Sequence, residues 1–245
     1  MISFGVWDIV LLVVVSAQAT TLSYLKDAKW KALVLALPIP FTLAALAVGA
    51  PVNTTHVAAL NLLLAYTHGV RLLHARAGVP IIPAITISAG GYCAAGALLR
   101  PVLPLTEAAF WATCVLTFLI AVAAHALFPK TEEPSHRTHL PVWIKFPLVA
   151  GIILALILIK RFLQGFMTMF PMVGVVASYE SRASLGAVCR TIPDFIIGMV
   201  PMMAVVRLLQ PRLGLGAALA AGWFVFLPML WPLVRDFWGR PAEKS

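Results

Sequence analysis

Long runs of apolar residues, separated by short polar segments, follow one another along the whole chain. A helix needs about 20 apolar residues to cross the roughly 30 Å hydrocarbon core of a bilayer. Backbone in contact with lipid must also satisfy its own hydrogen bonds, which favours helices. We therefore predict that each long run is a transmembrane helix. The nine predicted ranges are approximately Phe4–Leu22, Trp30–Val48, Thr55–Leu73, Val79–Leu99, Glu107–Phe128, Val142–Ile159, Phe162–Ser178, Leu185–Val206 and Leu213–Val234.

Composition agrees with this pattern and adds an orientation. Hydrophobic residues make up 61% of the 245 residues and charged residues only 11%, whereas soluble domains carry about 25% charged residues. The net charge is +9, but the basic residues lie in short loops, which is typical of a cytoplasmic membrane face rather than of nucleic-acid binding. With the N-terminus outside, twelve Lys and Arg fall in inside loops and five in outside loops. We predict an all-α polytopic membrane protein with its N-terminus outside and its C-terminus in the cytoplasm.

Two segments of the chain repeat each other. Val70–Gly78 and Val206–Gly214 are identical at six of nine positions. Upstream of each segment, a predicted helix contains proline: Pro38 and Pro40 in the first half, Pro171 in the second. These ordered landmarks predict an internal repeat of four helices.

The helix count gives this repeat a direction. Four helices return the chain to its starting side, and the fifth helix, Glu107–Phe128, crosses once more. The second unit is therefore expected to be inverted, in a 4+1+4 arrangement of residues 1–104, a linking helix with a polar cytoplasmic loop over residues 105–140, and residues 141–245. Inverted repeats of this kind build transporters with a site at the repeat interface.

The second unit also resembles a known family. The motifs are Phe170-Pro171 in its second helix, Ser178-Tyr179 at the end of that helix, and the run Leu185–Ile192. On these motifs, residues 141–234 are similar to the GlpM-like proteins, which are short four-helix bacterial inner-membrane proteins. The resemblance implies a bacterial inner-membrane setting and a doubled version of a four-helix unit, and it implies little about chemistry.

Charged residues inside apolar runs are the candidate functional groups, because a charge at bilayer depth costs about 3 kcal/mol. Arg190 and Asp194 are four residues apart, so they share a helix face and can pair. A substrate contact is one interpretation of this pair, and a structural pair with a snorkelling arginine is the other.

The corresponding region of the first unit carries a polar stripe. Thr54, Asn61 and His68 recur every seven residues and therefore line one side of a helix. Such a stripe can line a pathway or hold two helices together, and His68 could couple to protons. We include all three with Arg190 and Asp194 as predicted substrate-binding residues.

Other polar residues have simpler interpretations. We expect Glu180 and Arg182 to lie in a solvated loop, and Glu107 to interact with the N-terminus of its own helix. The stretch Pro129–Pro141 is interpreted as a solvated linker rather than a metal site.

Motifs for phosphate binding, zinc proteolysis and nucleophilic hydrolysis are missing from the chain. We therefore predict no enzyme activity, no cofactor and no resident metal. The favoured function is a secondary transporter, by alternating access, of a small solute, with an anion as one candidate, or of a lipid-linked cargo. The alternative is a non-transporting subunit of an envelope-biosynthesis complex. The expected partners are the lipid bilayer, the substrate and either a second copy or a partner subunit, with no nucleic acid.

Overall fold

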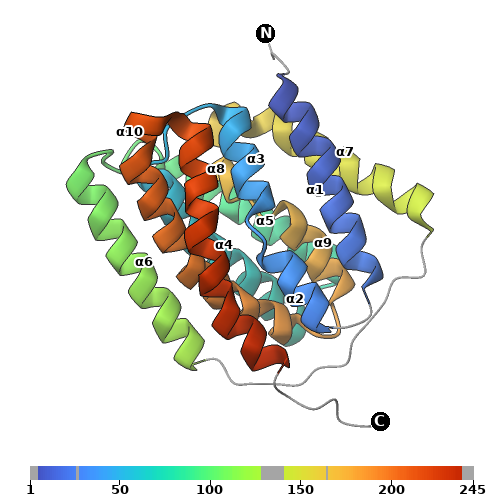
Figure 1. The fold of residues 1–245 in the computed structure, drawn as a ribbon. Coiled ribbons are helices and arrows are strands. Elements are labelled where there is room, and N and C mark those ends of the chain that lie inside the picture. The colour runs from blue at the N-terminus through green and yellow to red at the C-terminus, as the bar shows by residue number, and fades with distance from the viewer. Residues whose placement is uncertain (1–4, 26–27, 128–140, 164, 239–245) are drawn as a thin grey trace.

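The computed structural model describes residues 5–25, 28–127, 141–163 and 165–238, and these residues form helices and no strand. Figure 1 shows their arrangement. The elements are α1 (Val6–Tyr24), α2 (Ala28–Ala36), α3 (Ile39–Val48), α4 (Thr54–Arg71), η1 (Leu72–Arg76, a π-helix), α5 (Ile81–Leu99), α6 (Glu107–Leu127), α7 (Val142–Leu163), α8 (Gly165–Thr168), α9 (Met172–Glu180) and α10 (Leu185–Trp238). The predicted all-helical fold is confirmed, whereas most of the polar loop, positions 129–140, lies outside the described residues.

The longest helix is folded back on itself. An unbroken helix of the 54 residues of α10 would extend for about 80 Å, more than twice the thickness of a hydrocarbon core. Gly214 interrupts it with φ 75° and ψ 166°, a conformation that residues with a side chain rarely adopt. The two arms of α10 therefore run side by side (Figure 1), and they cover the eighth and ninth predicted ranges.

Five helical segments in the described part of the chain are long and apolar enough to cross a membrane. They are Val6–Tyr24, Trp30–Val48, Ile81–Leu99, Glu107–Leu127 and Leu185–Trp231. Since the last contains both arms of α10, these segments correspond to six of the nine predicted ranges, with ends that differ by up to three residues. Membrane crossing by α4, by α7 and by the α8–α9 pair stays a prediction.

The outer surface of these helices is apolar. Large side chains point away from the rest of the molecule on α5, α6 and α10; examples are Ile82, Leu119 and Phe224, which are 63%, 60% and 78% exposed. Water does not favour such an extended apolar surface, whereas lipid does.

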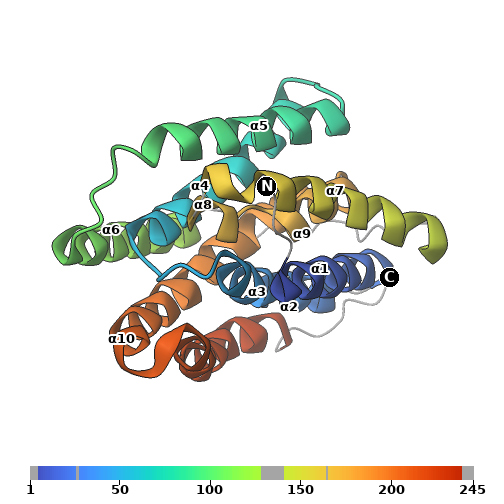
Figure 2. The same cartoon turned by 90° about the horizontal axis from the view of Figure 1, so that it is seen from above.

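The linking helix α6 lies along one side of the molecule and packs against α4 and α10. On the other side α1 packs against α3, α7 and α9. Seen from above, α5 and α10 lie on opposite sides, with α3, α4 and α8 between them (Figure 2). We call the upper end in Figure 1 the Glu107 end, where α6 begins, and the lower end the Glu180 end, where α9 stops.

Candidate functional site

The helical path through α2 and α3 is broken at Leu37 and Pro38. A proline has no N–H, so the carbonyl of Val34, four residues earlier, loses its helical donor. The side chain of Gln18, on α1, donates from Nε2 to the Val34 carbonyl oxygen at 2.8 Å. This contact explains why the Gln18 amide is buried, and it satisfies the backbone carbonyl at the first break.

A second break separates α8 from α9 at Phe170 and Pro171. The Phe170 N–H donates to the carbonyl of Met167 at 3.1 Å. It therefore does not form the regular helical hydrogen bond to the carbonyl of Phe166. The hydroxyl of Tyr92, on α5, donates to that Phe166 oxygen at 2.7 Å. Each break thus leaves a carbonyl that a side chain from another helix satisfies.

The two broken helices meet in the interior, where α3 packs against α8. Beyond the first break, Trp223 on the second arm of α10 donates from Nε1 to Thr42 Oγ1 at 2.9 Å. At the start of α8 the backbone of Gly165 lies against α4. A Cβ at Gly165 would clash with Thr55 Oγ1 and would lie 2.8 Å from His56 Nδ1, so only glycine permits this approach.

Further buried polar atoms lie on α1 and α4, the helices that pack against the two broken ones. Several have no hydrogen-bond partner among the described residues: Ser16 Oγ, Thr20 Oγ1, Thr54 Oγ1, His56 Nε2 and Asn61 Oδ1. Leaving a polar atom buried and unpaired costs about 1–3 kcal/mol. A protein that changes conformation can supply water or a ligand to such atoms in another state.

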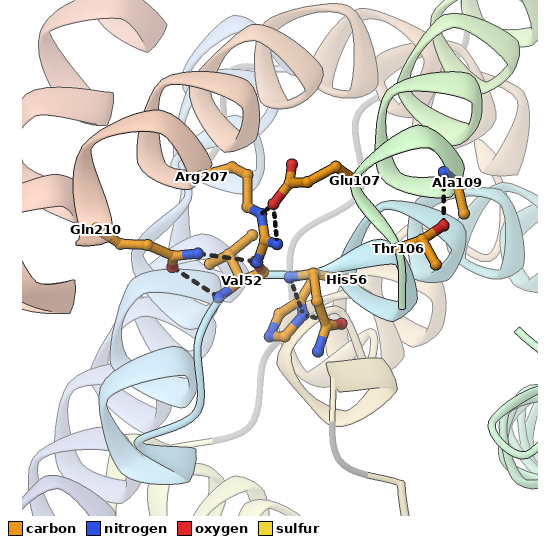
Figure 3. A network of polar contacts seen from close by, with 8 residues as sticks. Val52, His56, Thr106, Glu107, Ala109, Arg207 and Gln210 are labelled. Atoms are coloured by element: carbon orange, nitrogen blue, oxygen red, sulfur yellow. Dashed lines mark hydrogen bonds and ion pairs between the residues drawn. The ribbon is translucent and has the colours of Figure 1, made fainter. Parts of the chain in front are cut away.

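A polar network at the Glu107 end joins α6, α10 and the α3–α4 connection (Figure 3). Arg207 forms an ion pair with Glu107 and donates from Nη1 to the carbonyl oxygen of Val52 at 3.0 Å. Gln210 accepts from the Val52 N–H at 2.9 Å and donates to the Val52 carbonyl at 3.0 Å. The next residue, Asn53, caps α4 through the Thr55 N–H. Glu107 therefore has an arginine partner as well as its place at a helix N-terminus.

Two further side chains of α6, one near its middle and one near its C-terminal end, contact polar side chains from the two halves of the chain. Asn61 on α4 donates from Nδ2 to Thr117 Oγ1 at 2.7 Å. Asp194 on α10 pairs with Nδ1 of His125. Neither Thr117 nor His125 is among the residues predicted from the sequence, in which this helix is only a linker. Their spacing of eight residues, which places them on one face of α6, is the signal that could have found them.

The structure separates the five predicted site residues into different surroundings. Thr54 is buried at the start of α4, whereas His68 is half buried near Arg71 at its far end. Asn61 and Asp194 contact the same helix, α6. Arg190 is half buried and makes no hydrogen bond or ion pair with the described residues, so the pair expected from its spacing to Asp194 is not formed in this conformation. His125 binds Asp194 instead, because α6 packs against this face of α10.

The expectation for Glu180 is wrong. Glu180 is the last residue of α9, and its side chain is 1% exposed and paired with Lys145 Nζ of α7. Lys145 also lies 5.6 Å from the centre of the Tyr24 ring. The packing of α7 and α9 against the end of α1 removes this glutamate from water, which local polarity could not reveal.

No group of three His, Cys, Asp or Glu side chains within the described ranges could hold a metal ion. The apolar outer surface, the five long apolar helices and the internal polar contacts together define an α-helical membrane protein. Comparison with protein families, with curated proteins and with solved structures found no match to this chain.

Proposed function

We propose that this chain is a secondary transporter for a small solute, working by alternating access between two inverted four-helix units, residues 1–104 and 141–245. The observation that carries the proposal is the pair of proline-broken helices, α2–α3 and α8–α9, one from each unit, that pack against each other in the interior. Broken helices at membrane depth are tolerated where they are buried in protein or line a pathway, and transporters use them to bind solutes.

Three landmarks in the same order support the repeat. The first landmark is the broken helix, which follows α1 in one unit and α7 in the other. A polar residue then directly precedes a long helix: Asn53 before α4 and Ser184 before α10. Finally, Gly78 and Gly214 both have a positive φ, 67° and 75°, and a helix restarts after each. The proposed nine crossings place these landmarks on opposite sides of the membrane, because α6 adds a single crossing between the units.

The buried polar atoms without partners among the described residues support a protein whose interior changes conformation. Ser16 and Thr20 on α1 and His56 on α4 keep buried atoms without partners among the described residues. In a protein with one fixed conformation these groups would only lower stability. In a carrier they gain water or solute when the interior opens to one side.

The proposed substrate contacts remain those on α4 and α10. Arg190, half buried and with no carboxylate bound to it among the described residues, would bind an anionic group of the solute. Asp194 would be held by His125 until the solute arrives. Asn61, His68 and Thr54, which are spread along the length of α4, would supply polar contacts at successive positions of the solute. The resemblance of residues 141–234 to GlpM-like proteins supports a bacterial inner membrane as the location, with the N-terminus outside.

The first experiment tests the inverted topology. Single cysteines are placed within residues 71–76 and 207–212, in a variant without Cys93, Cys114 and Cys189, and are labelled in intact cells with a membrane-impermeant maleimide. We expect labelling of residues 207–212 only, with residues 71–76 reacting after the cells are permeabilised. Labelling of both segments from the same side would overturn the inverted repeat.

The second experiment measures transport. The purified protein in liposomes is tested with radiolabelled inorganic phosphate, sulfate and succinate as anionic probes. We expect flux of at least one probe above empty liposomes, and loss of most of that flux in Arg190→Ala and Asp194→Asn, with Arg212→Ala, an exposed arginine on the same helix, as the control. Unchanged flux in both variants would refute the assigned roles. No flux, combined with stable co-purification of another envelope protein, would favour the non-transporting subunit.

A further inference from the structure

The two repeated segments have different backbone conformations. Within Val70–Gly78, residues Leu72–Arg76 form a π-helix, in which the Ala77 N–H donates to the Leu72 carbonyl, five residues back, at 3.0 Å. The matching residues before Gly214 are part of the continuous α-helix of α10. Short π-helical segments occur mostly inside longer helices and frequently at functional sites. One sequence motif therefore exists in two forms in a single molecule.

The two segments also differ in their contacts: the second binds the backbone of the other unit, and the first does not. In the second unit, Arg207 and Gln210 bind the backbone of Val52, which is fully buried. We call this arrangement the Arg207 latch. The matching residues of the first unit are Arg71 and His74. His74 Nδ1 contacts the Val79 carbonyl of its own turn at 2.8 Å, and Arg71 makes no hydrogen bond or ion pair with the described residues.

A matching target exists at the Glu180 end. Val52 directly precedes Asn53, the residue before α4; in the second unit Ala183 directly precedes Ser184, the residue before α10. Unlike Val52, Ala183 is exposed. The two helices are already in contact nearby, because Cys189 Sγ lies 3.4 Å from the carbonyl oxygen of Thr67. Arg71 is one helical turn beyond Thr67 toward the same end.

We infer that Arg71 and His74 form a second latch, which binds the backbone of Ala183 when the protein opens at the Glu107 end. The inference rests on the proposed inverted repeat and alternating access. In the described conformation the Arg207 latch is engaged and the Arg71 latch is open. In the opposite conformation Arg71 donates to the Ala183 carbonyl, the π-helical segment returns to the α form, and Arg207 and Gln210 release Val52. The two arginines thus close opposite ends of the molecule in turn.

Spin-label distances test this inference on the whole protein in liposomes. One label pair, at Pro51 and Leu208, reports on the Glu107 end, and a second pair, at Ala183 and Leu72, reports on the Glu180 end; all four positions are exposed. The native cysteines are replaced as above. Because a hydrogen bond to a charged group contributes about 1.5–3 kcal/mol, losing a latch should change the ratio of the two conformations by about tenfold or more.

We expect Arg207→Ala with Gln210→Ala to lengthen the first distance and to shorten the second. Adding Arg71→Ala and His74→Ala to that variant should lengthen the second distance again. The ratio of the two conformations should shift back by at least tenfold. The matched control is the addition of Arg76→Ala instead, at an exposed arginine of the same segment. This substitution should leave the second distance short.

Two results would overturn the second latch. The first is that opening the Glu107 end fails to shorten the Ala183–Leu72 distance. The second is that the Arg71 and His74 substitutions act no more strongly than the Arg76 control. Either result leaves the transporter proposal intact when the maleimide labelling and flux experiments succeed. Labelling of both repeated segments from one side would remove the transporter proposal and the second latch together.

Discussion

Replacing Lys145 by methionine is the most direct test of the buried ion pair at the Glu180 end. The side chains of Lys145 and Glu180 are 5% and 1% exposed, and Glu180 Oε2 has no hydrogen-bond partner among the described residues. Methionine keeps most of the volume and removes the charge, so the carboxylate stays buried without its bonded cation. Removing one partner of a buried pair costs about 3–5 kcal/mol.

The magnitude follows from the size of the chain and the nearby charges. For a protein of 150–250 residues, each kcal/mol of lost stability lowers Tm by roughly 2–4 °C. Lys145→Met should therefore lower Tm by roughly 6–20 °C. The half-buried Lys31 also attracts the charge of Glu180, so we expect the lower part of this range. Tryptophan fluorescence during heating in detergent measures the shift, with size-exclusion chromatography of each variant as a check on folding.

The double variant Lys145→Met with Glu180→Leu separates the buried charge from a general packing defect. Replacing both partners of a buried pair by apolar residues of similar size is often neutral or stabilising, so most of the lost Tm should return. Arg212→Ala, on the exposed surface, should leave Tm unchanged. A Lys145→Met shift below 2 °C, or a double variant as unstable as the single one, would refute the reasoning.

Three further interior contacts can be tested by the same thermal measurement. Gly165→Ala should lower stability by about 1–3 kcal/mol through overpacking against Thr55 and His56, whereas Gly216→Ala, with open space around it, should not; equal effects would contradict the close approach. Tyr92→Phe should cost about 1–3 kcal/mol, because the Phe166 carbonyl is left buried without its donor, and a neutral result would argue against this contact. Asn61→Leu and Thr117→Val should each cost about 1 kcal/mol, and their double variant should cost less than the sum; strict additivity would mean that the two side chains do not interact.

The positions of the helices could be predicted from the sequence because each depends on local composition. An apolar run long enough to cross lipid forms a helix wherever it lies. The connection between the eighth and ninth helices was expected at residues 207–212, whereas these residues are helical and the bend falls at Gly214, because only glycine readily adopts that backbone. The prolines at 38 and 171 served only as landmarks of the repeat, and the breaks beside them were not predicted, because Trp30–Val48 and Phe162–Ser178 were each expected to be one helix. Five segments then met the criteria of length and hydropathy for a membrane crossing.

The partners of the polar side chains could not be predicted in this way. Spacing along α10 placed Arg190 and Asp194 on one face but did not reveal that His125 of α6 would occupy the space beside Asp194. Glu180, next to a polar turn in the sequence, looked solvated, although Lys145 lies against it. Tyr92 and Gln18 could not be recognised as donors to broken helices, because each acts on a carbonyl of a different helix.

By itself, the sequence determined an all-helical chain with two similar segments, since these follow from hydropathy and from shared residues. The bends inside the predicted helices were not among its predictions. Only the tertiary structure decided which helices are neighbours, and with them every long-range polar contact. The physical reason is that periodicity records which face of a helix avoids solvent, whereas the identity of the helix covering that face depends on how all of them pack at once.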